Sequence, residues 1–188
     1  LQFDNSFAGL PDAFYNRLAP HGLPAPYLVG ASHDVAELIG IPPEEIGRPE
    51  FTEIFAGNRP PPGSDTLAAV YSGHQFGVWA GQLGDGRALL LGEVVDGQSQ
   101  LRDVAFKGSG RTPFSRGGDG KAALGPMLRE YLISESMAAL GIPTTRALCI
   151  VGSDAPVRRE EYETAAVVTR VAPGFVRFGS FEHWASRK

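Results

Sequence analysis

The sequence contains 188 residues, of which 43% are hydrophobic and 20% are charged, and its formal net charge is −4. This composition is typical of one globular domain or of a large lobe of a longer protein, and it argues against disorder and against a membrane span. The acidic balance excludes nucleic acid as the default partner, because anion binding then depends on local clusters of Arg and Lys.

Residues 1–63 are rich in proline and glycine around short apolar stretches such as DVAELIG. This spacing disfavours long regular elements, so we expect an extension of short helices and turns that wraps around the rest of the chain. The first residues, LQFDNSF, contain neither a secretion signal nor a transit signal. We expect both termini to be cut edges of a longer polypeptide.

Three β-strands are predicted in the runs FGVWAGQL, ALLLGEVV and LRDVAFK, between residues 76 and 107. The Asp-Gly pairs of GDGR and DGQSQ separate these runs, and such pairs are typical of hairpin turns between antiparallel strands. Two further strands are predicted later in the chain, in RALCIVG and TAAVVTRVA, joined by the charged connection APVRREEYE. The predicted class is α+β, with an antiparallel sheet and one long helix.

The long helix is predicted over residues 126–140, where an apolar face that includes Leu128 and Leu132 recurs at helical spacing. Pro126 suits the first helical position and Gly141 suits the residue after the helix end. Two carboxylates, Glu130 and Glu135, lie near this face. Helical geometry alone favours Glu135 as the more buried of the two, and a buried carboxylate needs a partner.

Neither the cysteine nor the histidines form a metal-binding motif. Cys149 is the only cysteine and lies in the apolar run RALCIVG, so we expect a buried structural thiol. The four histidines lack the spacing of metal ligands, and no metal site is predicted from them: His21, His33, His74 and His183.

The loop over residues 108–121 is the most informative segment, because its fourteen residues hold five glycines and three cations. Unstructured loops of this length in compact domains are usually functional or disordered. Glycines let backbone N–H groups converge on an oxyanion, which Arg111, Arg116 and Lys121 would neutralise. A solvated, mobile loop is the alternative interpretation.

Lys107 ends the preceding strand at the mouth of this loop, where an ammonium group can meet a phosphate or a helix carboxylate. The four residues from Val104 to Lys107 resemble the V-A-I-K strand of protein kinases, whose lysine pairs with a glutamate of the next helix. From the residues alone, Glu130 and Glu135 both remain candidates for that partner. An ordinary surface lysine at a strand end is the alternative.

A kinase-like site also needs a glycine-rich turn, and Gly84 and Gly86 lie in GQLGDGR, although this is not a GxGxxG motif. A tight turn without a ligand explains the GDG equally well, whereas Arg87 favours an anion. Arg170 near a strand end and Arg177 seven residues later add two more cations. Together with the strand lysine and the loop, they would enclose a triphosphate.

Four segments together resemble the selenoprotein O family of kinase-like proteins: YSGHQFG (71–77), QLGDGR (82–87), FKGSGRTPFSRGGDG (106–120) and GIPTTRAL (141–148). The resemblance implies a protein-kinase-like N-terminal lobe over residues 64–188, with residues 1–63 as its extension. It also implies a protein adenylyltransferase, which transfers AMP from ATP to Ser, Thr or Tyr hydroxyls of proteins and uses Mg²⁺ or Mn²⁺.

The resemblance further implies roles for individual residues. Lys107 and Glu130 would form the catalytic ion pair, which selects Glu130 over Glu135. The implied ATP-binding residues are Gly84, Gly86, Arg87, Lys107, Asp119, Gly120, Arg170 and Arg177. The catalytic Asp and the metal ligands of the family lie beyond residue 188, so no metal ligand is predicted here and this chain alone is expected to be inactive.

Two alternatives to the adenylyltransferase remain: a conventional protein kinase and a non-catalytic nucleotide- or phosphate-binding module. The resemblance implies a location in the bacterial cytoplasm, or in mitochondria for a eukaryotic member. Two positions depart from the family pattern, Gly125-Pro126 at the start of the helix and Gly118 in the loop. We expect these changes to shift the start of the helix and to loosen the loop.

Overall fold

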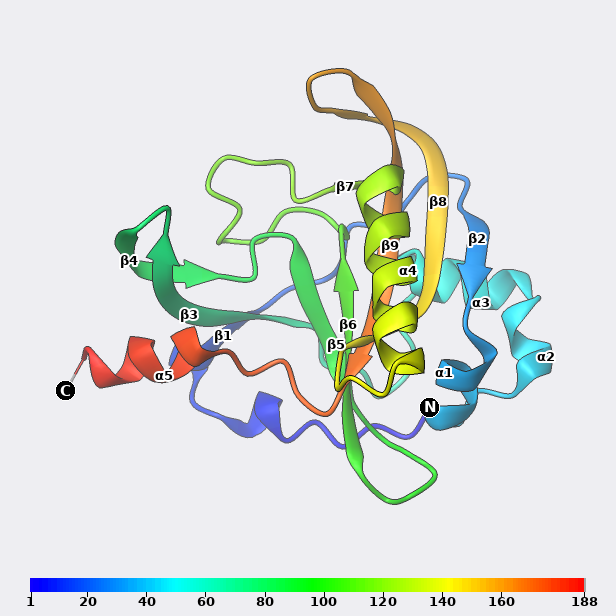
Figure 1. Ribbon diagram of the computed structural model, residues 1–188, viewed down its shortest axis with the longest axis horizontal. Coiled ribbons are helices and arrows are strands. Elements are labelled where there is room, and N and C mark those ends of the chain that lie inside the picture. The colour runs from blue at the N-terminus through cyan, green and yellow to red at the C-terminus, as the bar shows by residue number, and fades with distance from the viewer. Residues whose placement is uncertain (188) are drawn as a thin grey trace.

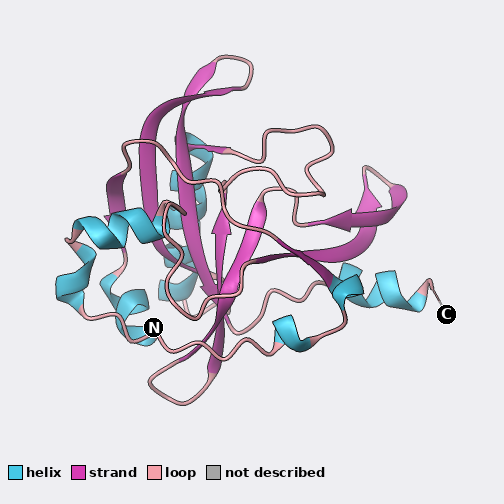
Figure 2. Ribbon diagram, turned by 180° about the vertical axis from the view of Figure 1, so that it is seen from behind, coloured by secondary structure: helices cyan, strands magenta, loops and turns pink. Residues whose placement is uncertain are grey.

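The computed structural model describes residues 1–187, which form an α+β structure dominated by one antiparallel sheet (Figures 1 and 2). The strands run in the order β1-β3-β5-β6-β9-β8-β2, with β4 paired to β3 and β7 paired to β9. Their bounds are β1 (Tyr15–Arg17), β2 (Tyr27–Ala31), β3 (Leu67–Gln75), β4 (Val78–Gly84), β5 (Ala88–Val95), β6 (Leu101–Lys107), β7 (Ala122–Ala123), β8 (Arg146–Arg158) and β9 (Tyr162–Ala172).

Helices cover the two faces of this sheet. The short helices α1 (His33–Leu38), α2 (Pro43–Ile46) and α3 (Pro49–Phe55) contribute to the main core on one face, where the ring of Phe55 meets Phe106 of β6 edge-on at 6.5 Å. The long helix α4 (Leu124–Ala139) lies on the other face across β8 and β9 (Figure 1), and α5 (Phe178–Ala185) packs against β3. The sheet is therefore buried on both sides at its centre.

The alternation of side chains along the central strands decides what faces each side. On β6, Val104 and Phe106 enter the main core, whereas Lys107 lies on the opposite face. On β9, Val167 and Val171 enter the same core, whereas Arg170 lies on the face of Lys107. Because β6 and β9 are paired directly, the two cations come from neighbouring strands.

Residues 1–63 contain the short helices that the Pro and Gly spacing predicts, with single 3-10 turns at Phe7–Gly9 and Asp12–Phe14. They also supply two strands at the ends of the sheet, because β1 pairs with β3 and β2 pairs with β8. The division of the chain at residue 63 stays a prediction. No helix within residues 1–187 combines the length and the apolar character needed to cross a membrane.

Helix α4 begins two residues earlier than predicted and ends one residue earlier, at Ala139, with Gly141 at a φ of +73° after its last turn. Pro126 is its third residue, which the helix tolerates because N–H groups of the first turn have no partner within the helix. The predicted apolar face is partly wrong. Leu128 and Leu132 are 37% and 62% exposed, since α4 packs on the sheet through Met127 and its neighbours instead.

The strand predictions are correct in some places and wrong in others. The hairpin at DGQSQ is confirmed, because β5 and β6 pair on either side of it. The hairpin predicted at GDGR does not form. Strand β4 instead pairs with β3, through a turn at Phe76 and Gly77, which both have a positive φ. Strand β3 was not predicted. Strands β8 and β9 extend through most of APVRREEYE, which was predicted as a connection.

Candidate functional site

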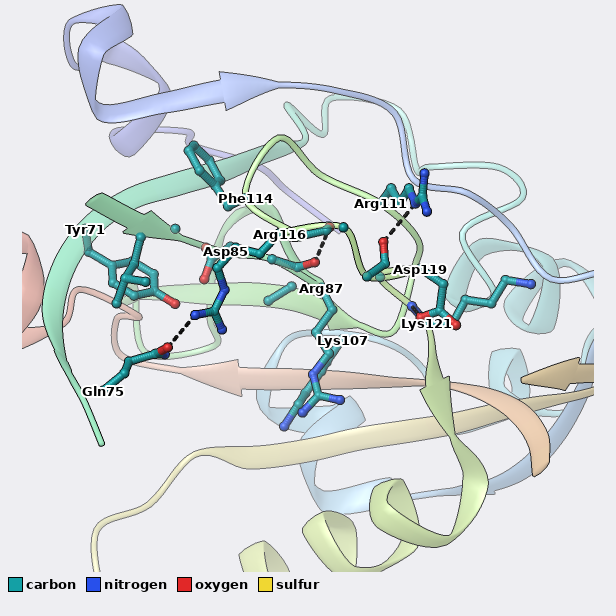
Figure 3. Close-up of a pocket in the computed structure, with 18 of the residues that line it drawn as sticks. Tyr71, Gln75, Asp85, Arg87, Lys107, Arg111, Phe114, Arg116, Asp119 and Lys121 are labelled. Atoms are coloured by element: carbon teal, nitrogen blue, oxygen red, sulfur yellow. Dashed lines mark hydrogen bonds between the residues drawn. The ribbon is translucent and has the colours of Figure 1, made fainter. Parts of the chain in front are cut away.

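A cavity of about 1110 Å³ opens beside the loop over residues 108–121, at the ends of β4, β5 and β6 (Figure 3). Nine cationic side chains and two carboxylates line it. All eight residues predicted to bind ATP lie along this cavity: Gly84, Gly86, Arg87, Lys107, Asp119, Gly120, Arg170 and Arg177. The sequence prediction therefore named residues that share one cavity, although they come from widely separated segments.

Lys107 forms an ion pair with Glu130 of α4, the partner that the resemblance implied. The other carboxylate oxygen of Glu130 lies 3.5 Å from Nη1 of Arg170. Glu130 thus holds a cation from each of two neighbouring strands on the helix-covered face of the sheet. The shift in the start of α4 does not disturb this contact.

Glu135 has a different partner, which lies outside the cavity. Arg146 donates two hydrogen bonds to its carboxylate, at 2.9 and 2.8 Å. The hydrogen bonds from Arg146 hold the pKa of Glu135 below its ordinary value. The side chains of Glu130 and Glu135 are 25% and 27% exposed, so the expectation that Glu135 is the more buried carboxylate is wrong.

Arg170 is the most buried cation of the ion pairs at this cavity, with 15% of its side chain exposed. Burial lowers its pKa, which Glu130 partly offsets. Its guanidinium lies 5.0 Å above the ring of Phe175. Its Nε atom is buried and has no hydrogen-bond partner among the residues that the structure describes. A buried donor without a partner is unusual in native proteins.

Arg177 is held at the cavity by two residues that the sequence did not point to. Its Nη2 atom donates a hydrogen bond to Oδ1 of Asp85 at 3.1 Å, and its guanidinium lies 4.8 Å above the ring of Tyr71. The other carboxylate oxygen of Asp85 accepts the backbone N–H of Ala69 at 3.2 Å. Only its place between Gly84 and Gly86 marked Asp85 in the sequence.

The loop over residues 108–121 is tied to the rest of the site by hydrogen bonds. The backbone N–H of Gly110 donates to the carbonyl of Gly120 at 3.2 Å, which closes the base of the loop. The hydroxyl of Thr112 donates to the carbonyl of Asp85 at 2.6 Å, and the hydroxyl of Ser115 donates to the carbonyl of Gly86. These contacts favour an organised loop over a solvated, mobile one.

Gly84 and Gly86 are required by packing, independently of any ligand. A Cβ atom on Gly84 would lie 2.3 Å from the ring of Phe114, and one on Gly86 would lie 2.7 Å from the carbonyl oxygen of Phe114. Phe114 is placed there by the loop that Figure 3 shows folding over the turn. These two glycines therefore let the basic loop approach the end of β4.

Asp119 is bound by an arginine that no sequence signal connected with it. Arg159, at the turn between β8 and β9, approaches both carboxylate oxygens of Asp119, at 2.9 and 3.2 Å. The hydrogen bonds from Arg159 hold the pKa of Asp119 below its ordinary value, with the backbone N–H of Lys121 adding to the effect. A ligand that uses Asp119 would therefore meet a carboxylate that is already paired and ionised.

The cysteine and the histidines that the sequence analysis considered do not form a further site. Cys149 is fully buried, as predicted, and burial raises the pKa of its thiol to about 12. Within the described residues, no three His, Cys, Asp or Glu side chains gather in a way that could hold a metal ion. His183 is buried and its Nδ1 lies 2.8 Å from the hydroxyl of Ser72.

The fold and the cavity together define an α+β protein with a strongly basic pocket suited to a polyanion. Lys107, Arg170 and Arg177 converge there, and the turn and loop glycines allow two backbone segments to pack closely beside them. Several phosphates in a row match such a set of cations better than a single carboxylate does.

The comparison with known proteins identifies the family. The family model described as "Protein adenylyltransferase SelO" matches residues 1–188. A protein nucleotidyltransferase YdiU from Dechloromonas aromatica is 68% identical over 185 residues, which cover 98% of this chain and 37% of the relative. The YdiU protein of Bordetella petrii is 61% identical over 190 residues, which cover 100% of this chain and 38% of the relative.

This chain belongs to the SelO family. The relatives carry the name protein nucleotidyltransferase, in agreement with the family that the four sequence segments indicated. The chain spans less than two fifths of the length of these relatives, with 37% and 38% covered.

Proposed function

We propose that this chain is the ATP-binding part of a protein adenylyltransferase, built as the N-terminal lobe of a kinase-like fold. The whole protein would transfer AMP from ATP to Ser, Thr or Tyr hydroxyls of other proteins. Its partners would be protein substrates, and its bacterial relatives are compatible with the predicted cytoplasmic location.

The observation that carries this proposal is the convergence of Lys107, Arg170 and Arg177 on one cavity. A triphosphate presents charge at several points, and cations from β6, β9 and the segment before α5 can meet it together. Glu130 keeps Lys107 and Arg170 oriented through its two carboxylate oxygens.

The proposed reaction is a displacement at the α-phosphorus of ATP. The oxygen of the substrate hydroxyl forms a bond to that phosphorus and its proton is released to solvent. The bond from the α-phosphorus to the bridging oxygen of the β-phosphate breaks, and pyrophosphate leaves with that electron pair. The cations of this chain would bind the phosphates and offset the charge that develops on the leaving pyrophosphate. Among residues 1–187 no ligand set for Mg²⁺ or Mn²⁺ is present, so we assign no step and no metal ligand to these residues.

The decisive experiment uses the full-length protein with ATP that is labelled separately at the α- and γ-phosphates. We expect the α label to remain on a protein target, and intact mass to show an AMP adduct. Transfer of the γ label alone would instead establish a conventional kinase. Binding of ATP without transfer of either label would support a non-catalytic binding module.

A paired substitution tests the choice of helix carboxylate. Glu130→Gln is expected to lower the rate of AMP transfer by about tenfold or more, because Lys107 and Arg170 lose the charge that orients them. Glu135→Gln serves as the control, since its partly exposed pair with Arg146 contributes only about 1 kcal/mol or less to stability. Equal rates of transfer in the two variants would argue against a role for Glu130.

A further inference from the structure

Asp103 is a buried carboxylate that the proposed reaction does not use. It lies on β6 four residues before Lys107, and the alternation of the strand places both side chains on the same face. Only 8% of Asp103 is exposed. In the antiparallel register, it stands opposite Glu93 of β5, which is 7% exposed. Two neighbouring carboxylates in a buried region destabilise each other's charged forms.

The two carboxylates have different partners. Glu93 accepts hydrogen bonds from the hydroxyl of Ser6 at 2.8 Å and from the backbone N–H of Phe7 at 2.6 Å. Asp103 accepts a hydrogen bond from the backbone N–H of Phe175 at 2.7 Å, and it forms no ion pair within residues 1–187. Asp103 is therefore kept buried with one hydrogen bond, and that bond joins it to the segment between β9 and α5.

That segment carries parts of the anion cavity. The ring of Phe175 lies under the guanidinium of Arg170, and two residues later Arg177 reaches Asp85. The segment runs from the end of β9 to α5 (orange to red in Figure 1). A small cavity of about 30 Å³ lies beneath it and is lined by residues that include Asp103, Phe175, Arg170 and Arg177. Both arginines also line the large cavity.

We propose that Asp103 is a positioning residue for the anion site: by holding the backbone N–H of Phe175, it fixes the segment that places Arg177 at the cavity and the ring of Phe175 under Arg170. The proposal rests on the proposed function, because it takes the phosphates of ATP as the anion. It assigns a role to a buried group that otherwise only destabilises the sheet.

The ionisation of Asp103 predicts a pH dependence of ATP binding that tests this role. Burial, with a smaller contribution from Glu93, raises its pKa from 3.8 to about 6, against the hydrogen bond from Phe175. Apart from Glu93, the titratable and charged groups around the small cavity are Tyr71, Asp85, Arg170 and Arg177. Below about pH 6 Asp103 becomes protonated and holds the N–H of Phe175 less strongly, so the affinity for ATP should fall.

The stability effect has the opposite sign. Between pH 3.8 and about 6 the folded protein keeps a proton on Asp103 that the unfolded chain has already released. This group therefore lowers stability as the pH rises through that range, and its full destabilising effect is present above about pH 6. The substitution Asp103→Asn removes this destabilisation, because the side chain no longer ionises, and it preserves the side-chain shape and an oxygen atom that can accept a hydrogen bond. The variant should be at least as stable as the wild type at pH 8.

The test compares the full-length wild type with Asp103→Asn in calorimetric binding of ATP and of AMP, from pH 5 to pH 8. At pH 8 we expect the substitution to weaken ATP binding by about tenfold, while AMP binding, which lacks the outer phosphates, changes little. At pH 5 the two proteins should bind ATP equally, because Asp103 is then neutral in both. The protonation state of ATP also changes between pH 5 and pH 8, but it is the same for both proteins at each pH and does not contribute to the difference between them.

Asp96→Asn is the matched control, because Asp96 belongs to the turn of the same β5–β6 hairpin and its side chain is fully buried. This variant should lose stability, since Arg102 loses its carboxylate partner, but should keep the ATP affinity of the wild type. The proposal is overturned if Asp103→Asn binds ATP like the wild type at pH 8, or if it loses ATP and AMP affinity equally. A wild type that binds no ATP would instead refute the proposed function.

Discussion

Replacement of Lys107 by alanine is expected to weaken ATP binding by about 30-fold or more in the full-length protein. Lys107 is the cation that β6 presents to the cavity, and its partner Glu130 is left with Arg170 alone when the ammonium is removed. The phosphates would then lose one cation and lie near a carboxylate that Arg170 alone neutralises. Equilibrium binding of ATP, followed by the rate of AMP transfer, measures both consequences.

Lys121→Ala is the control for this substitution, because Lys121 lines the same cavity and its ammonium has no carboxylate partner among the described residues. It tests whether any loss of one positive charge has the same effect. We expect a change of about threefold or less, as is usual for a charge at the rim of a site. Unchanged ATP affinity in the Lys107→Ala variant would count heavily against the site assignment.

Gly120→Ala is expected to destabilise the protein by about 3 kcal/mol or more and to abolish ordered closure of the loop. Gly120 has a φ of +67°, and a Cβ atom there would lie 2.0 Å from the carbonyl oxygen of Gly110 and 2.5 Å from the backbone nitrogen of Arg111. Backbone atoms of the same loop cannot yield without breaking the bond between Gly110 and Gly120. Urea unfolding measures the loss of stability.

Gly117→Ala is the matched control in the same loop. Gly117 also has a positive φ, +81°, but nothing lies within 4 Å of a Cβ atom placed on it. The Gly117→Ala substitution should lower the free energy of unfolding only by the backbone strain of a positive φ, about 1 kcal/mol. If the two variants unfold at the same urea concentration, close packing at Gly120 is not what closes the loop.

Local sequence patterns predicted the ends of those helices and strands that are determined by the residues at the ends themselves. The turn at DGQSQ is set by Asp96, whose carboxylate accepts the backbone N–H groups of Gln98 and Gln100, and α4 ends before Gly141, which has a positive φ. The same kind of signal failed at GDGR. Strand β4 pairs with the unpredicted β3, and the turn residues Gly84 and Gly86 pack against Phe114 instead of closing a hairpin.

The set of site residues came mainly from the family resemblance. The structure brings the eight predicted ATP-binding residues to one cavity, and Glu130 is joined to it through its ion pairs with Lys107 and Arg170. The residues that sequence reasoning missed are the partners: Asp85 for Arg177, and Arg159 for Asp119. These pairs join positions 92 and 40 residues apart in the chain. Nothing in the local pattern of either residue indicates the other.

From the sequence alone one can therefore read the acidic overall charge, the cluster of cations and glycines after Lys107, and the β-forming runs of the central strands. The tertiary structure decides which carboxylate each cation meets. The position of α4 on the sheet brings Glu130 to Lys107 and Glu135 to Arg146, whereas helical periodicity alone had favoured Glu135 as the more buried carboxylate. Ion pairs between distant segments depend on strand register and on loop packing, which no single segment encodes.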